Sequence, residues 1–176
     1  EKEYAVEPAH TRKNIMIIGG GVAGMEAARV AKLRGHQVTL YEKTDKLGGH
    51  LIEACVPDFK DDEKRLLQWY QNEMKSLNIN IKFNTEVTPD MVKTENPDAV
   101  IIATGSNPVT LNVPGINMGN VVGAGDLLLG EKAVGDSVAV VGAGLVGCEM
   151  ALWLAKQHKK VTLIEALSNI LSAGRP

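Results

Sequence analysis

The sequence IMIIGGGVAG, residues 15–24, decides the fold, because an apolar run passes directly into a glycine-rich turn. A short, continuous apolar run is typical of a strand buried on both faces of a parallel sheet. Residues 25–34 then have a helical pattern that ends at Gly35, a common C-terminal cap. Residues 38–41, VTLY, predict a second strand, and Glu42 stands at its end. The stretch therefore predicts a β-α-β unit of about 30 residues.

The same pattern occurs a second time near the other end of the chain. Residues 138–141, VAVV, predict a strand that runs into the turn GAGLVG at residues 142–147. A helix from residue 148 to about 157 follows, and then a strand at residues 161–164 and Glu165. Internal duplication of this kind predicts two nucleotide-binding units in tandem.

The residues between the two copies complete the expected α/β architecture. They predict helices at 61–77 and 89–95 and strands at 79–83 and 99–103. Strands that alternate with helices favour a doubly wound parallel sheet of Rossmann type. The Pro- and Gly-containing stretch 107–117 is the expected crossing, which divides the chain into residues 1–118 and 119–176. Beyond this crossing, Asp126 is expected to be a helix N-cap.

Each glycine of the two turns has a physical reason. The first, at 19 and 142, permits the tight turn from strand to helix, and the third, at 24 and 147, lets helix and strand pack closely. The second, at 21 and 144, lets the backbone approach a pyrophosphate, which also meets the positive end of the helix. One such turn is weak evidence, but each copy follows a strand, opens a helix and precedes an acidic residue about 20 positions on.

Glu42 and Glu165 are the expected ribose ligands. A carboxylate at the end of the second strand accepts hydrogen bonds from the adenosine ribose and repels a 2′-phosphate. No arginine stands immediately after Glu165, so the second site is expected to prefer NADH to NADPH.

Composition excludes several other classes of protein. The 176 residues carry a formal net charge of -2, which provides no basic surface for nucleic acid. Neither a signal peptide nor an apolar stretch long enough to span a bilayer is present, which favours a cytoplasmic protein. Cys55 and Cys148 form no C-x-x-C pair, so a thioredoxin-reductase-like or peroxide-reducing enzyme is the least favoured hypothesis. The histidines have no metal-ligand spacing, and His50 is expected to be a solvent-facing loop residue.

These residues resemble a family of flavoenzymes. The stretch 13–54, with GGGVAGMEAA at 19–28 and LGG at 47–49, and the stretch 138–149 are similar to the C-terminal region of enzymes that join an old-yellow-enzyme-like barrel to a disulfide-reductase-like module. That family includes 2,4-dienoyl-CoA reductase, enoate reductase, NADH oxidases and trimethylamine dehydrogenase. The resemblance implies an FAD-binding unit at 1–118, a partial NAD-binding unit at 119–176 and a chain that is a fragment of a longer polypeptide.

The resemblance also implies roles for individual residues. The first site would hold FAD, or ADP in the same place, through a glycine turn, a ribose carboxylate, a loop along the cofactor, a backbone edge that reads adenine and a crossing near the flavin: Gly19, Gly21, Val22, Ala23, Gly24, Glu42, Lys43, Gly48, Gly49, Glu86, Val87, Ala103, Thr104 and Gly105. The second site would hold NADH through Gly142, Gly144, Leu145, Val146, Gly147 and Glu165. No side chain is expected to be catalytic, because the chemistry belongs to the cofactors.

The leading functional hypothesis is an electron-transfer module. In such enzymes hydride passes from NADH to FAD, and electrons continue through an iron–sulfur cluster to FMN in an N-terminal barrel domain of the same polypeptide. The barrel, the cluster cysteines and the later Gly-Asp motif for the ribityl chain are not in this sequence, so full turnover by this chain alone is not expected. The alternative hypothesis is a structural nucleotide-binding module that holds ADP or AMP without redox turnover. The final electron acceptor and the oligomeric state, including a homo-oligomer, are left open.

Overall fold

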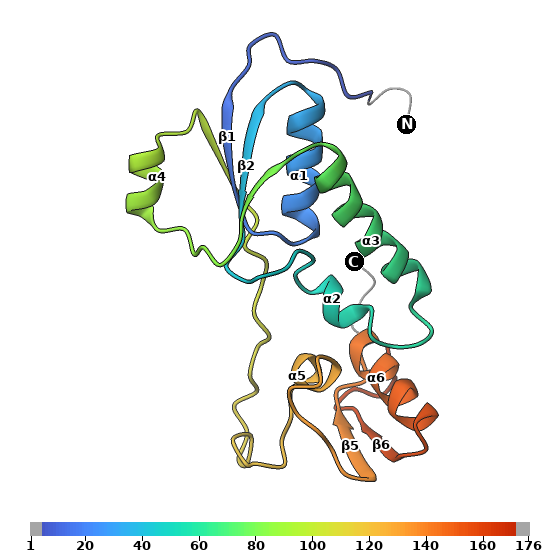
Figure 1. Ribbon diagram of the computed structural model, residues 1–176. Helices are drawn as coiled ribbons and strands as arrows, with labels where there is room; N and C mark the ends of the chain where they lie inside the picture. Colours follow the sequence, from blue (N-terminus) through green and yellow to red (C-terminus); the bar gives the residue numbers. More distant parts are fainter. Residues whose placement is uncertain (1–4, 172–176) are drawn as a thin grey trace. The chain divides into compact units, whose positions relative to one another are not determined.

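The computed structural model describes residues 5–171, which divide into two compact units. The first unit contains the residues up to Cys55 together with Lys60–Pro108, and the second contains Val56–Phe59 and the residues from Val109 onward. The elements of both units are labelled in Figure 1. Each unit is an α/β structure with a parallel sheet, as the alternating pattern of the sequence predicts.

A four-stranded parallel sheet in the order β3-β2-β1-β4 forms the first unit. Its strands are β1 (Asn14–Ile18), β2 (Gln37–Tyr41), β3 (Asn80–Lys82) and β4 (Ala99–Ile102). In the register of the sheet, Ile17 of β1 lies beside Leu40 of β2 on one side and Ile101 of β4 on the other. Since all four strands are parallel, their carboxyl ends meet at one edge, where α/β proteins bind their ligands.

Helices cover both faces of this sheet (Figure 1). On one face α1 (Val22–Leu33) and α3 (Asp61–Ser76) pack over the core, with the short α2 (Leu51–Ala54) between them in sequence, while α4 (Pro89–Glu95) lies on the other side. The core joins strand and helix residues that are fully or almost fully buried, among them Ile17, Met25, Ala28, Leu40 and Met74. This packing fixes the start of α1 at the carboxyl end of β1.

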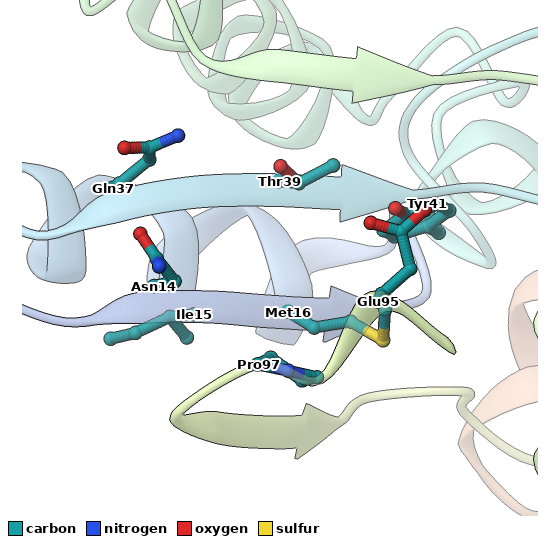
Figure 2. A pocket seen from close by; sticks show the side chains of 8 residues that line it. All are labelled: Asn14, Ile15, Met16, Gln37, Thr39, Tyr41, Glu95 and Pro97. Atoms are coloured by element: carbon teal, nitrogen blue, oxygen red, sulfur yellow. The ribbon is translucent and has the colours of Figure 1, made fainter. Parts of the chain in front are cut away.

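The sheet face beside α4 carries a small open pocket of about 190 Å³ (Figure 2). Its lining comes from β1, β2 and the end of α4: Asn14, Ile15, Met16, Gln37, Thr39, Tyr41, Glu95 and Pro97. Burial, and then the nearby Glu95 carboxylate, raise the pKa of Tyr41. None of the residues expected to bind a dinucleotide lines this pocket, so the expected sites lie elsewhere, at the strand ends.

In the second unit β5 (Ser137–Val141) and β6 (Lys160–Ile164) form a parallel pair joined by α6 (Leu145–Lys156), and α5 (Ala124–Leu128) precedes them. The segment Val56–Phe59 belongs to this unit through Lys156, whose Nζ lies 2.7 Å from Asp58 and 5.4 Å from the centre of the Phe59 ring. Within the described residues this sheet has two strands, and Val141 at the end of β5 is 67% exposed.

Most elements lie where the sequence predicts them, and the differences have local causes. Helices α1 and α6 begin at Val22 and Leu145, three residues earlier than expected, because the last residues of each glycine turn are already helical. The prediction for Asp126 is wrong: Gly123 is the N-cap of α5, and Asp126 lies in the first turn, where its carboxylate pairs with Lys132 at 2.9 Å.

Candidate functional site

Two positions of the first glycine turn, 19 and 24, can hold only glycine. Gly19 has a φ of +108°, and a Cβ at this position would overlap the carbonyl oxygen of Ala103. A Cβ at Gly24 would overlap the carbonyl oxygen of Gly19. These two contacts bring the start of α1 against the ends of β1 and β4. The sequence predicts such close packing of helix and strand for the third glycine.

The second glycine of each turn leaves free space instead. An added Cβ at Gly21 would find its nearest neighbour, the Gly49 Cα, at 3.9 Å, and one at Gly144 would find no atom of the described residues within 4 Å. Both glycines are N-caps with nearly the same backbone, at φ -74° and ψ -175° for Gly21 and φ -70° and ψ -175° for Gly144. The two copies therefore present the same opening at the start of a helix.

Among residues 5–171, no side chain caps the backbone N–H groups at these two openings. Neither Gly21 nor Gly144 provides a capping hydrogen bond, and neither α1 nor α6 has an acidic residue in its first turn. Helix α4 differs, because the Thr88 hydroxyl accepts a hydrogen bond from the Met91 amide. A helix start with free N–H groups and a positive dipole is suited to an anion such as a diphosphate.

Glu42 is fixed beside the first opening. Its side chain is buried, and its Oε2 accepts a hydrogen bond of 2.7 Å from the Gly20 amide. Its Oε1 accepts two further hydrogen bonds of 2.8 Å, from the amide and the hydroxyl of Thr44. The carboxylate that the sequence assigns to the ribose is thus held by the turn itself and by the residues that follow it.

The second copy repeats this arrangement with Glu165. Its Oε2 accepts a hydrogen bond of 2.7 Å from the Ala143 amide, and its Oε1 accepts one of 2.9 Å from the Leu167 amide. These bonds, that of Leu167 first and that of Ala143 second, lower the pKa of Glu165 below its usual range. In both copies the carboxylate and the bonded turn amide are 22 residues apart in sequence.

The loop at Gly48 and Gly49 lies against the first turn. The Gly48 amide donates a hydrogen bond of 2.9 Å to the Gly20 carbonyl, and a parallel bridge joins Gly48 to Gly21. The loop therefore flanks the opening at the start of α1. Lys43, beside Glu42, is exposed to solvent.

The remaining residues of the first site lie at the same sheet edge. Backbone hydrogen bonds from Asn84 to Thr44 and from Thr85 to Glu42, both of 2.9 Å, continue the pairing beyond β3, and Glu86 and Val87 follow directly in sequence. On the other side, the Ala103 amide donates to the Ile18 carbonyl at 2.8 Å. Thr104 and Gly105 continue from there. The ends of all four strands thus bring these residues together.

The second opening differs from the first in its surroundings. Gly142 has a φ of +97°, and its amide donates to the Ile164 carbonyl at 2.8 Å, but an added Cβ there would meet nothing within 4 Å. Leu145 and Val146, in the first turn of α6, are 66% and 63% exposed. The described chain thus supplies the turn, the helix start and the carboxylate of this site, and no neighbour corresponding to Ala103.

Thr44 and Leu167 are residues of the two candidate sites that sequence reasoning missed. Both hold a glutamate through the backbone amide two positions after it, a contact that any residue except proline can make. Only the Thr44 hydroxyl carries a signal in the sequence, because its side chain adds a second donor to Glu42.

Other types of site find no support in the described residues, 5–171. No group of histidine, cysteine or acidic side chains among them could hold a metal ion, and no helix among them is long and apolar enough to cross a membrane. Cys55 and Cys148 are both free thiols, and burial raises the pKa of Cys55. The two glycine openings remain the candidate sites, and their free amides and unfilled space fit the diphosphate group of a dinucleotide.

Comparison with known proteins agrees with this geometry. A profile of the family described as pyridine nucleotide-disulphide oxidoreductase matches residues 13–175. The chain is 48% identical, over its whole length, to cinnamate reductase from Clostridium sporogenes and 39% identical, over 94% of its length, to NADH oxidase from Thermoanaerobacter brockii. In each case it spans 26% of the relative's length.

Among solved structures, the chain superposes on 2-naphthoyl-CoA reductase with a TM-score of 0.90 and 36% identity. The superposition covers 96% of this chain and 26% of the reductase. These relatives confirm the predicted resemblance to enoate-reductase-like flavoenzymes and the predicted Rossmann-type fold.

Proposed function

We propose, since this chain belongs to the pyridine nucleotide-disulphide oxidoreductase family, that it forms the dinucleotide-binding part of a larger oxidoreductase, with FAD bound in residues 1–118 and NADH in residues 119–176. The family is one of flavin-dependent enzymes that use NAD(P)H. The observation that carries the proposal is the repeated hydrogen bond of 2.7 Å between a turn amide and a glutamate, from Gly20 to Glu42 and from Ala143 to Glu165.

The residues of the chain bind and orient the two nucleotides. The free amides at the starts of α1 and α6 hold the diphosphates, where the second glycine of each turn leaves room. In Glu42 the Oε1 lone pairs are taken by the amide and the hydroxyl of Thr44, so the free lone pair of Oε2 would receive a ribose hydroxyl. In Glu165 the amides of Ala143 and Leu167 each use one lone pair of one oxygen, and the remaining capacity would receive the ribose. When bound, NADH supplies a hydride and FAD stores the electron pair.

The same proposal places the end of the electron path outside this chain. The chain spans 26% of the length of its reductase relatives, which leaves room for further domains in a protein of that size. We infer that an N-terminal barrel with FMN and an iron–sulfur cluster receives the electrons, as in the family that the sequence resembles. The substrate would bind there.

Titration with FAD and ADP tests the first site. The 176-residue chain is expected to bind both nucleotides, and to bind FAD more tightly by roughly tenfold, because the Gly48–Gly49 loop and the Thr104–Gly105 crossing add contacts beyond the ADP half. Calorimetry gives both dissociation constants, and the flavin absorbance checks retention of the cofactor. Equal constants would instead favour a structural module that holds ADP, and failure to bind either nucleotide would refute the assignment.

Substitution of Glu165 tests the second site. In Glu165→Gln the negative charge that repels a 2′-phosphate is removed, so the affinity for NADPH relative to NADH is expected to rise about tenfold. Because the folded pKa of Glu165 is lowered, the wild-type preference should hold above the usual glutamate pKa and vanish only as the pH falls through the lower folded value.

Fluorescence titration with both nucleotides, from pH 8 down to below the usual glutamate pKa, measures this ratio. Glu131→Gln, an exposed substitution in the same unit, is the matched control and should leave it unchanged. An unaltered ratio in Glu165→Gln would show that this carboxylate does not contact the ribose.

A further inference from the structure

His50 connects two segments that flank the first opening. It directly follows the Gly48–Gly49 loop and precedes α2. Its Nδ1 lies 2.7 Å from the Glu53 carboxylate, and its Nε2 lies 2.8 Å from the carbonyl oxygen of Ser106, 56 residues further along the chain. Both ring nitrogens thus face an oxygen that can only accept a hydrogen bond.

This arrangement determines the charge of the ring. A neutral imidazole has one N–H group, so one of its nitrogens would place a lone pair against an oxygen lone pair. An imidazolium donates to both oxygens, and charge-assisted hydrogen bonds are the stronger kind. The Ser106 carbonyl first, and the Glu53 carboxylate second, raise the pKa of His50, while partial burial and the nearby Lys43 oppose them.

The hydrogen bond from His50 to Ser106 restrains a segment that forms few other hydrogen bonds in the described structure. Pairing with β1 ends at Ala103, and in the described structure residues 104–112 make no hydrogen bond other than the one from His50. On its other side, His50 adjoins the Gly48–Gly49 loop, which is bonded to Gly20 of the glycine turn. The side chain is 56% exposed, as expected for a loop histidine, yet it joins two segments.

We propose that His50 is a positioning residue that holds the Thr104–Gly105 crossing against the Gly48–Gly49 loop, so that FAD meets both segments already assembled. The proposal rests on the proposed function for its choice of ligand. An exposed ion pair with Glu53, three residues along a short helix, would by itself contribute little. The structural effect of His50 therefore comes from its hydrogen bond to the Ser106 carbonyl, 56 residues away in sequence.

The raised pKa of His50 fixes the direction in which FAD affinity should change with pH. Because the folded pKa is raised, the doubly bonded imidazolium is fully present below the usual histidine pKa of about 6.5 and is lost as the pH rises through the folded value. Lys43 and Glu53 are the charged groups that face the ring. FAD affinity of the wild-type chain should therefore fall about fivefold to tenfold between pH 6 and pH 9. ADP affinity should stay constant, since ADP does not need the crossing.

Two variants and a control complete the experiment. His50→Ala removes both hydrogen bonds and should bind FAD about tenfold more weakly at pH 6, with no dependence on pH. His50→Gln keeps a neutral donor for the Ser106 carbonyl and should recover part of the affinity, also without pH dependence. His10→Gln, an exposed histidine outside the site, should behave as the wild type.

Backbone ¹⁵N relaxation of Gly105, Ser106 and Asn107, measured without nucleotide, tests the same contact independently, because in the described structure these amides donate no hydrogen bond of their own. Their order parameters should fall in His50→Ala and, in the wild type, as the pH rises through the folded pKa of His50. Identical order parameters and identical FAD profiles in the wild type and His50→Ala would overturn the proposal. If the wild type bound neither FAD nor ADP, the proposed function would fail, and the order parameters alone would then decide the role of His50.

Discussion

Substitution of Gly19 by alanine is expected to destabilise the first unit by about 3–5 kcal/mol. Two costs add. A φ of +108° is a conformation that residues with a Cβ rarely adopt, and the new methyl group would overlap the backbone of Ala103 at the end of β4. Neither cost can be relieved by a side-chain rotation, because the obstructing atoms belong to a sheet strand's end.

Gly142 provides the matched control for this substitution. It has nearly the same backbone, with a φ of +97°, but an added Cβ would meet nothing within 4 Å. Gly142→Ala should therefore show only the backbone cost, about 1–3 kcal/mol. Hydrogen exchange at Ile17 in β1 and at Val140 in β5 reports on the two units separately, which avoids a two-state assumption for the whole chain. Equal losses in the two variants would show that the contact with Ala103 is unimportant.

The sequence predicts the difference between Gly19→Ala and Gly142→Ala only in part. The order of glycines, strands and glutamates follows from local rules, because a buried strand needs a continuous apolar run and a tight turn needs a residue without a Cβ. The partner of Gly19 does not follow from them, because Ala103 lies 84 residues further along the chain. Its position beside Gly19 depends on the pairing of β4 with β1, which is a property of the sheet.

The same limit applies to the polar contacts of the site. Glu42 and Glu165 could be found because a carboxylate at a strand end has few structural explanations. The amides that hold them could not, because a backbone N–H carries no sequence signal. His50 could be read as a solvent-exposed loop residue, which its exposure bears out, but its bond to Ser106 required the fold. The short helix α2, of four residues, also has too little periodicity to be recognised.

Glu42 is expected both to stabilise the first glycine turn and to bind the ribose of the nucleotide. Its two oxygens face donors only: the Gly20 amide on one side, and the amide and hydroxyl of Thr44 on the other. In Glu42→Gln the amide nitrogen would have to point an N–H group at one of these backbone N–H groups. A buried donor without an acceptor costs about 1–3 kcal/mol, and here the donor belongs to the glycine turn. We therefore expect the first unit to lose roughly that much stability and the affinity for both FAD and ADP to fall about 10- to 100-fold.

Thr44→Val separates the two roles, because it removes the hydroxyl while keeping the backbone amide that bonds Glu42. It should cost about 1 kcal/mol and leave ADP binding nearly unchanged, since the carboxylate keeps its bonds to two amides. Denaturant unfolding followed through exchange at Ile17, together with ADP calorimetry, measures both effects for each variant. Because the charge of Glu42 would hold the turn and receive the ribose at once, stability and affinity should fall together in Glu42→Gln. A variant that bound ADP as tightly as the wild type would refute the ribose contact, whatever its stability.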